Sequence, residues 1–80
     1  MLLVVDIGNS NLTACPVRDG VLGGVRRATS QRGSTADELE LLLDGLLRLD
    51  GHRLDEVSAI ACASVVPTLT AALGRLAGAR

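Results

Sequence analysis

One capped amphipathic helix, with strand-like segments on both sides of it, constrains the fold of this chain most. Thr35 and Glu38 have the spacing of a capping box, in which each side chain binds the backbone N–H of the other residue. The leucines that follow at helical spacing share one face: Leu39, Leu42, Leu43, Leu46 and Leu47. Asp50-Gly51 predicts the end of the helix, with Gly51 as its C-cap.

Three strand-like segments precede this helix. Leu2–Val5 is a continuous apolar run, which is typical of a strand buried on both faces. Leu12–Val17 predicts a second strand, and Asp19-Gly20 is a strong hairpin signal. Val21–Thr29 then predicts a third strand, with Gly23-Gly24 as a bulge or a close approach of two backbones.

A further strand and helix are predicted after the capped helix. Val57–Ala63 reads as a fourth strand, and Pro67 suits the first turn of a second helix with Leu69, Leu73 and Leu76 on one face. The expected order is β-β-β-α-β-α, without a linker or repeat. Hairpin-joined strands followed by a helical crossover predict an α/β fold, a mixed sheet with helices on its faces. The 80 residues leave room for one small domain at most.

The composition excludes several classes of partner. The chain has no Phe, Tyr or Trp, so it lacks the platform on which nucleic-acid bases stack. Its net charge is −1 and all eight basic residues are Arg, which removes both a basic footprint and a P-loop lysine. We therefore expect no nucleic-acid partner.

The cysteines and the apolar segments predict a cytoplasmic protein. Cys15 and Cys62 stand 47 positions apart without a CxxC motif, which suits two buried thiols in a reducing compartment better than a zinc site. The N-terminus lacks the basic and apolar regions of a signal peptide. Val57–Gly74 is uncharged over 18 residues, but a strand, a loop and a helix explain it better than a membrane span. No membrane partner is expected.

The best candidate site is the segment Asp6–Thr13, where a carboxylate ends the first strand and a turn of small polar residues follows. Backbone N–H groups in such a turn converge on an anion, and Ser10, Asn11 and Thr13 can donate to phosphate oxygens. Asp6 would repel phosphate but could hold Mg²⁺, directly or through water. A plain hairpin turn is the alternative interpretation, because Asn-rich turns are common.

Three segments resemble the type III pantothenate kinase family. The run Asp6-Ile7-Gly8-Asn9-Ser10-Asn11 resembles its first phosphate motif, Asp-x-Gly-Asn-Thr-Asn, which the wider actin-like kinase superfamily shares loosely. Thr35–Glu38 resembles its Thr-x-Asp-Glu helix start. Ala63–Thr70 resembles its Ser-Ser-Val-Val-Pro segment, which is the more specific of the three.

The resemblance implies a ribonuclease-H-like (actin-like ATPase) half-domain, with residues 1–80 as its N-terminal ATP-phosphate-binding lobe. Members of the family phosphorylate pantothenate with ATP, the first step of coenzyme A synthesis. They are cytoplasmic homodimers that use Mg²⁺ and a monovalent cation, K⁺ or NH₄⁺. The implied ATP phosphate loop comprises Asp6, Ile7, Gly8, Asn9, Ser10, Asn11, Leu12 and Thr13.

The chain departs from the family pattern at several points. Ser10 replaces the usual Thr but keeps its hydroxyl, and Cys15-Pro16 stands where the family usually has an aromatic-containing strand. The resemblance places a fifth strand, a third helix, the pantothenate pocket and the catalytic base of a Gly-x-Asp-Arg segment beyond Arg80. We therefore expect an N-terminal fragment of the first lobe or the product of a truncated gene, inactive alone, with one sheet edge open beside Val57–Ala63.

Two other functions fit the same residues. The chain could be a non-catalytic accessory protein of the family that resembles a transcriptional activator. It could also belong to another actin-like kinase of small molecules, although Val65-Val66-Pro67 argues against this. Arg26, Arg27 and Arg32 could reach an anion, but a solvated strand end is the simpler interpretation.

Overall fold

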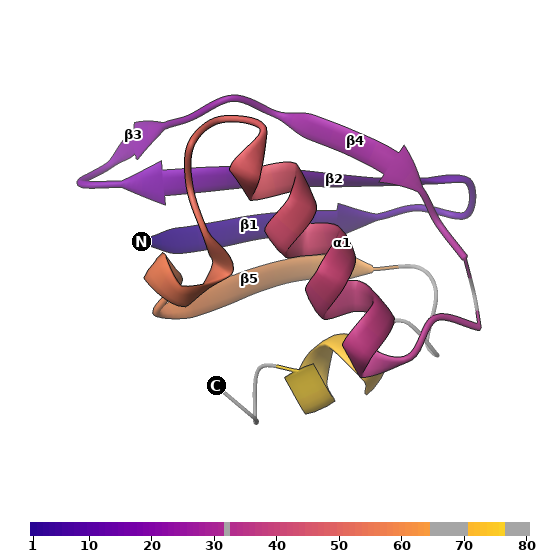
Figure 1. The fold of residues 1–80 in the computed structure, drawn as a ribbon. Coiled ribbons are helices and arrows are strands. Elements are labelled where there is room, and N and C mark those ends of the chain that lie inside the picture. The colour runs from indigo at the N-terminus through magenta and orange to yellow at the C-terminus, as the bar shows by residue number, and fades with distance from the viewer. Residues whose placement is uncertain (32, 65–70, 77–80) are drawn as a thin grey trace.

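The computed structural model describes residues 1–31, 33–64 and 71–76 and shows a mixed α/β domain (Figure 1). The elements run in the order β1 (Leu2–Ile7), β2 (Asn11–Arg18), β3 (Val21–Leu22), β4 (Arg26–Thr29), α1 (Ala36–Arg48), the short 3₁₀ helix η1 (Leu54–Glu56) and β5 (Ala59–Ser64). Residues 71–76 are helical. None of the helices in these three ranges is long and apolar enough to cross a membrane.

The strands form one mixed sheet, as predicted. β3, β2, β1 and β5 lie side by side in that order, and β4 pairs with β2 as well. β1 is antiparallel to β2 and parallel to β5. Among the described strands β5 has β1 as its one partner, so it lies at the edge that was expected to be open.

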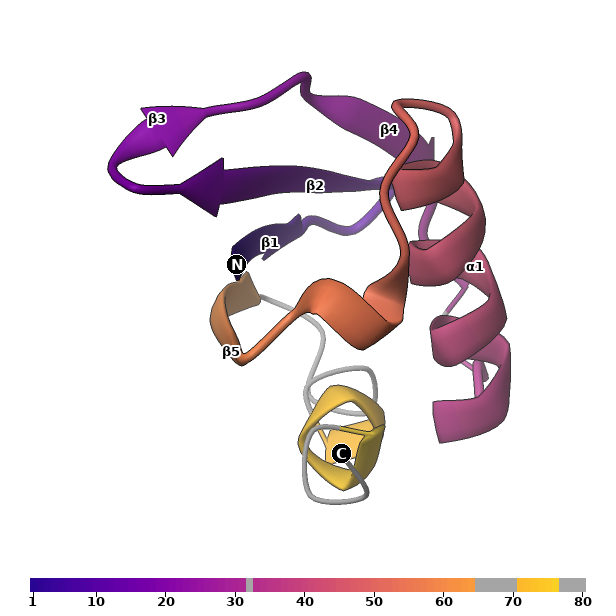
Figure 2. The same cartoon turned by 60° about the vertical axis from the view of Figure 1, so that its left-hand side comes forward.

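β1 is buried on one face, and the prediction of burial on both faces is wrong. Leu3, Val5 and Ile7 are at most 1% exposed, whereas Val4 is 38% exposed and Asp6 is exposed. The reason is that α1 and the helical residues 71–76 pack against the same face of the sheet (Figure 2). We call this the inner face. The opposite one, the outer face, carries Val4, Asp6, Thr13 and Arg27.

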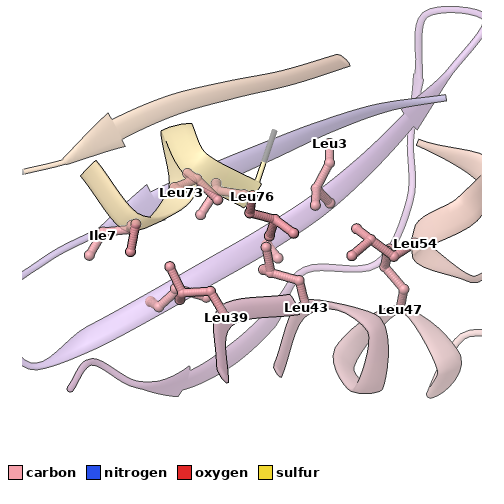
Figure 3. Close-up of a cluster of buried hydrophobic side chains, with 12 residues drawn as sticks. Leu3, Ile7, Leu39, Leu43, Leu47, Leu54, Leu73 and Leu76 are labelled. Carbon is pink, nitrogen blue, oxygen red and sulfur yellow. The ribbon is translucent and has the colours of Figure 1, made fainter. Parts of the chain in front are cut away.

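The core between the sheet and the helices consists of aliphatic side chains. Figure 3 shows the larger ones: Leu3, Ile7, Leu39, Leu43, Leu47, Leu54, Leu73 and Leu76. On the predicted apolar face of α1, the three leucines spaced four residues apart are buried: Leu39, Leu43 and Leu47. The other two, Leu42 and Leu46, are half-buried. Leu73 and Leu76 are buried as predicted for the second helix, whereas Pro67 and Leu69 lie outside the described residues.

The ends of α1 follow local signals in the sequence. The Thr35 hydroxyl accepts from the Glu38 N–H at 3.1 Å, and the Glu38 carboxylate accepts from the Thr35 N–H at 2.9 Å, so the capping box is confirmed. At the other end the C-cap is Leu49 and not Gly51. Gly51 instead supplies the left-handed residue beyond it, at φ +79°, and its N–H donates to the Arg48 carbonyl at 3.1 Å.

The predicted third strand is interrupted, and Pro16 explains why. The Asp19-Gly20 hairpin forms as predicted, with both residues at positive φ. β3 stops at Leu22, and Gly23 then lies so close to Pro16 that an added Cβ would stand 2.8 Å from the proline Cγ. The Gly23 N–H donates to the Pro16 carbonyl at 2.8 Å. This is the predicted close approach, and it separates β3 from β4.

Candidate functional site

The turn between β1 and β2 brings the predicted phosphate-binding residues to one end of the sheet. Three residues, Gly8, Asn9 and Ser10, connect the two strands. The Gly8 N–H donates to the Asn11 carbonyl at 2.8 Å, which closes the turn. β1 and β5 are parallel and β4 runs in the same direction, so the carboxyl ends of these strands meet at this end (Figure 1).

The pleat of β1 and β2 sorts the predicted site residues between two faces. Asp6 pairs with Thr13 in the strand register, and both lie on the outer face. Ile7 and Leu12 pair as well, but their side chains are 1% exposed and belong to the core. These two residues can therefore offer a ligand only their main chain. The side chains that solvent reaches most freely at the turn are Asn9, Ser10 and Asn11.

Ser30 is a contact of the turn that sequence reasoning missed. It follows β4, and its N–H donates to the Ser10 carbonyl at 3.0 Å. Its hydroxyl oxygen is buried and has no hydrogen-bond partner among the described residues. The Asn11–Thr29 pair lies next to it in the register of β2 and β4. No local signal marks this serine, because its partner lies 20 residues earlier in the chain.

Two consecutive arginines of β4 lie on opposite faces of the sheet. Arg26 pairs with buried Ala14 and therefore faces inward, where its guanidinium binds Asp50 at 2.7 and 3.0 Å. Arg27 pairs with Thr13 and is exposed on the outer face. The register thus aligns Asp6, Thr13 and Arg27 across three neighbouring strands.

The electrostatic environment of Asp6 extends to β5. Burial raises the pKa of the Cys62 thiol, and the negative charge of Asp6 raises it further. Cys62 pairs with Val5, the residue before Asp6, and so lies on the inner face. Cys15 lies on the outer face with its sulfur 3.5 Å from the Gly23 carbonyl. Both thiols are free, but the prediction that both are buried is wrong, because Cys15 is half-buried and Cys62 lies exposed on the edge strand β5.

The donor set at Asp6 fits a cation that is shared with bound phosphate. No group of three or more His, Cys, Asp or Glu side chains gathers anywhere in residues 1–31, 33–64 and 71–76. Mg²⁺ in nucleotide sites is typically held by one or two carboxylates together with substrate phosphates and water. One exposed carboxylate beside the hydroxyl of Thr13 meets this requirement.

A pocket of about 330 Å³ lies away from this turn, at the other end of β1 and β2. Its lining is Met1, Pro16, Arg18, Asp19, Val21, Leu22, Gly23 and His52. Next to it the Arg18 guanidinium binds the Glu56 carboxylate at 2.8 Å. The pocket contains none of the predicted phosphate-binding residues, so it provides no evidence about the nucleotide.

Comparison with known proteins gives one consistent family. The family model described as "Type III pantothenate kinase" matches residues 2–80. The type III pantothenate kinase of Geobacter sulfurreducens is 40% identical over 95% of this chain and 30% of its own length. Type III pantothenate kinase 1 of Symbiobacterium thermophilum is 45% identical over 94% of this chain and 28% of its own length. The type III pantothenate kinase of Moorella thermoacetica is 40% identical over 91% of this chain and 29% of its own length. The chain spans less than a third of the length of these relatives.

Proposed function

Because the chain belongs to the type III pantothenate kinase family, we propose that residues 1–80 form the N-terminal ATP-phosphate-binding lobe of an enzyme that phosphorylates pantothenate. The chain covers 30% and 28% of the length of the Geobacter sulfurreducens and Symbiobacterium thermophilum relatives, so we assign only the nucleotide-binding turn to its residues. No residue of this chain is assigned as the catalytic base or to the pantothenate pocket.

The observation that carries the proposal is the geometry of the Asp6–Thr13 turn. Asn9 and Ser10 are exposed at the carboxyl end of β1, while the buried side chains of Ile7 and Leu12 fix the turn to the core below. An exposed polar turn held by buried strand ends suits a phosphate site, because the hydrogen-bond donors of the turn are in place before the ligand binds. Thr13 adds a hydroxyl on the outer face.

Asp6 has a different role from the rest of the turn. Its carboxylate repels phosphate, so we assign it to Mg²⁺, held directly or through water, with the Thr13 hydroxyl beside it. When bound, Mg²⁺ neutralises negative charge on the phosphates. Asp6 is exposed on the outer face, so solvent and a hydrated ion can reach its carboxylate.

Membership of the family extends the proposal to properties beyond the turn. We propose the ribonuclease-H-like, actin-like fold for the half-domain that this mixed sheet begins. We further propose K⁺ or NH₄⁺ as a second cation, a homodimer and a cytoplasmic location. None of these properties is assigned to a residue of this chain.

Amide chemical shifts of the ¹⁵N-labelled chain test the turn. MgATP should shift the amide signals of residues 8–13 and of Ser30, and MgAMP should shift them much less, since it lacks the β- and γ-phosphates. Asp6→Asn should weaken the Mg²⁺-dependent part of the shifts. Asp19→Asn is the matched control, because it removes a carboxylate from the hairpin at the other end of the sheet. MgATP shifts confined to residues outside 6–13 would overturn the proposal.

A further inference from the structure

Arg27 has a charge that the described fold does not use. Three other arginines are paired with carboxylates: Arg18 with Glu56, Arg26 with Asp50 and Arg48 with Asp44. No ion pair or hydrogen bond of the Arg27 side chain is found among the described residues. The neighbour Arg26 shows that β4 can neutralise an arginine when its side chain faces inward.

The sheet register places this charge beside the candidate phosphate turn. Arg27 is the cross-strand partner of Thr13, which in turn is the partner of Asp6. Paired Cα atoms in antiparallel strands lie roughly 5 Å apart, so Asp6 and Arg27 flank Thr13 at about 10 Å from each other. All three side chains lie on the outer face, at the end where the turn closes.

We propose that Arg27 binds the phosphate chain of the nucleotide at the Asp6–Thr13 turn. The inference rests on the proposed function, and it adds a residue that the motif Asp6–Asn11 does not contain. A guanidinium is suited to this task because its planar set of donors matches phosphate oxygens and keeps its charge at every physiological pH. Residues 1–80 contain no lysine, so arginine is the permanently charged side-chain cation that these residues can bring to the turn.

The row Asp6–Thr13–Arg27 has opposite charges at its two ends, which suit different parts of a magnesium–nucleotide complex. Asp6 stands on the β1 side of Thr13 and is suited to a metal ion, whereas Arg27 stands on the β4 side and is suited to phosphate oxygens directly. A polyphosphate lying along the row would meet an anion-binding group on the side away from Asp6. The Ser30–Ser10 hydrogen bond connects the end of β4 to the turn, so Arg27 and the turn are held together as one unit.

The affinity of the 80-residue chain for MgATP and for inorganic triphosphate tests the inference. Arg27→Gln should lower the affinity for both ligands about tenfold, the usual effect of losing a charge-assisted hydrogen bond. The affinity of Arg27→Lys should lie between those of the wild type and Arg27→Gln, since lysine keeps the charge but lacks the planar donor set. Raising the salt concentration should lower the affinity of the wild type more than that of Arg27→Gln, because salt screens the charge that only the wild type carries at this position.

Arg75→Gln is the matched control. Arg75 is exposed and lies in the helical residues 71–76, which pack on the inner face. Its substitution removes the same charge and should leave both affinities unchanged. Amide spectra of each variant verify the fold, which should not change because both arginines are exposed and neither has a hydrogen-bond or ion-pair partner in residues 1–31, 33–64 and 71–76.

The outcomes separate this inference from the proposed function. If MgATP shifts residues 8–13 in the wild type and Arg27→Gln binds it equally well, the inference is wrong and the proposed function stands. If Arg75→Gln weakens binding as much as Arg27→Gln, the effect is one of net charge and the inference is wrong. If the wild type shows no shifts at residues 8–13 with either ligand, the proposed function fails and the inference fails with it.

Discussion

Arg26 holds Asp50 through two hydrogen bonds, with its Nε and Nη2 atoms 3.0 and 2.7 Å from the two carboxylate oxygens. The pair connects β4 to the segment that follows α1, so it joins the sheet to its covering helix across 24 residues of sequence. Gly24 leaves room for it, because an added Cβ there would stand 3.2 Å from a carboxylate oxygen of Asp50.

The stabilising effect of this pair should be lost in acid. The hydrogen bond from Arg26 holds the pKa of the Asp50 carboxyl below its usual value. A carboxyl whose pKa is lower in the folded state stabilises the fold above its unfolded pKa, about 3.9, and that contribution disappears as the pH falls through the folded value. Asp50→Asn should therefore lower the melting temperature modestly near neutral pH, because both side chains of the pair are partly exposed to solvent.

Melting curves of the wild type and Asp50→Asn, recorded from about pH 7 down to pH 2, measure this effect. The two curves should converge below about pH 4. Asp19→Asn, in the β2–β3 turn, is the control for loss of one negative charge. A difference between wild type and Asp50→Asn that stays constant over the whole range would contradict the ionic role of the pair.

Two glycine substitutions should have opposite effects on stability. Gly23→Ala would force its Cβ to within 2.8 Å of the Pro16 ring, and we expect it to destabilise the fold by about 1–3 kcal/mol, as overpacking does. Gly45→Ala lies in α1 with no atom within 4 Å of the added Cβ and should stabilise the fold by about 0.5–1 kcal/mol. Urea unfolding of both variants gives the two free energies, and a neutral Gly23→Ala would disprove the close approach.

Asp6→Asn should separate catalysis from folding. In a complete enzyme that carries this N-terminus, the loss of a charge next to the proposed Mg²⁺ should lower the catalytic rate about a hundredfold, corresponding to roughly 3 kcal/mol. Stability should hardly change, because Asp6 is exposed and the backbone of the turn is unaltered. Melting temperature and single-turnover rate are measured on the same sample. A destabilised enzyme with its full rate would mean that Asp6 is only a turn residue.

The 80-residue chain by itself should not phosphorylate pantothenate. Phosphoryl transfer requires a positioned acceptor and in most cases a base, and the proposal assigns neither to these residues. Incubation with ATP, Mg²⁺, K⁺ and pantothenate, followed by an assay for 4′-phosphopantothenate, checks this expectation. Steady turnover above that of a sample with Asp6→Asn would show that the chain contains a complete site.

The local features of the fold could be predicted because their partners lie within a few residues. The Thr35–Glu38 capping box, the Asp19-Gly20 turn and the leucine face of α1 depend on hydrogen bonds or spacings inside one helix or one hairpin. The Asp6–Thr13 turn belongs to the same class, since it is closed by the bond from Gly8 to Asn11. The polar candidate residues were therefore evident from the sequence.

Features that join distant segments were decided by the tertiary structure alone. The apolar run Leu2–Val5 is compatible with burial on one face or on both, and the packing of both helices on one side left Val4 and Asp6 on the other. The break after β3 depends on Pro16, which approaches Gly23 from the neighbouring strand. Gly23-Gly24 predicts a close approach of two backbones but does not identify Pro16 as the partner, and the run Leu2–Val5 does not show which face the helices cover.

The same reason explains what the sequence could not predict about the site. The sequence does not distinguish Arg26 from Arg27, because both are arginines of the same strand. Only the register between β2 and β4 places Arg26 on the face of Asp50 and Arg27 on the face of Thr13. Side chains alternate along a strand, so a shift of one residue would exchange the two arginines. The sequence by itself therefore determined the polar turn that we propose as the phosphate site. The pairing of strands decided which positive charge stands beside it.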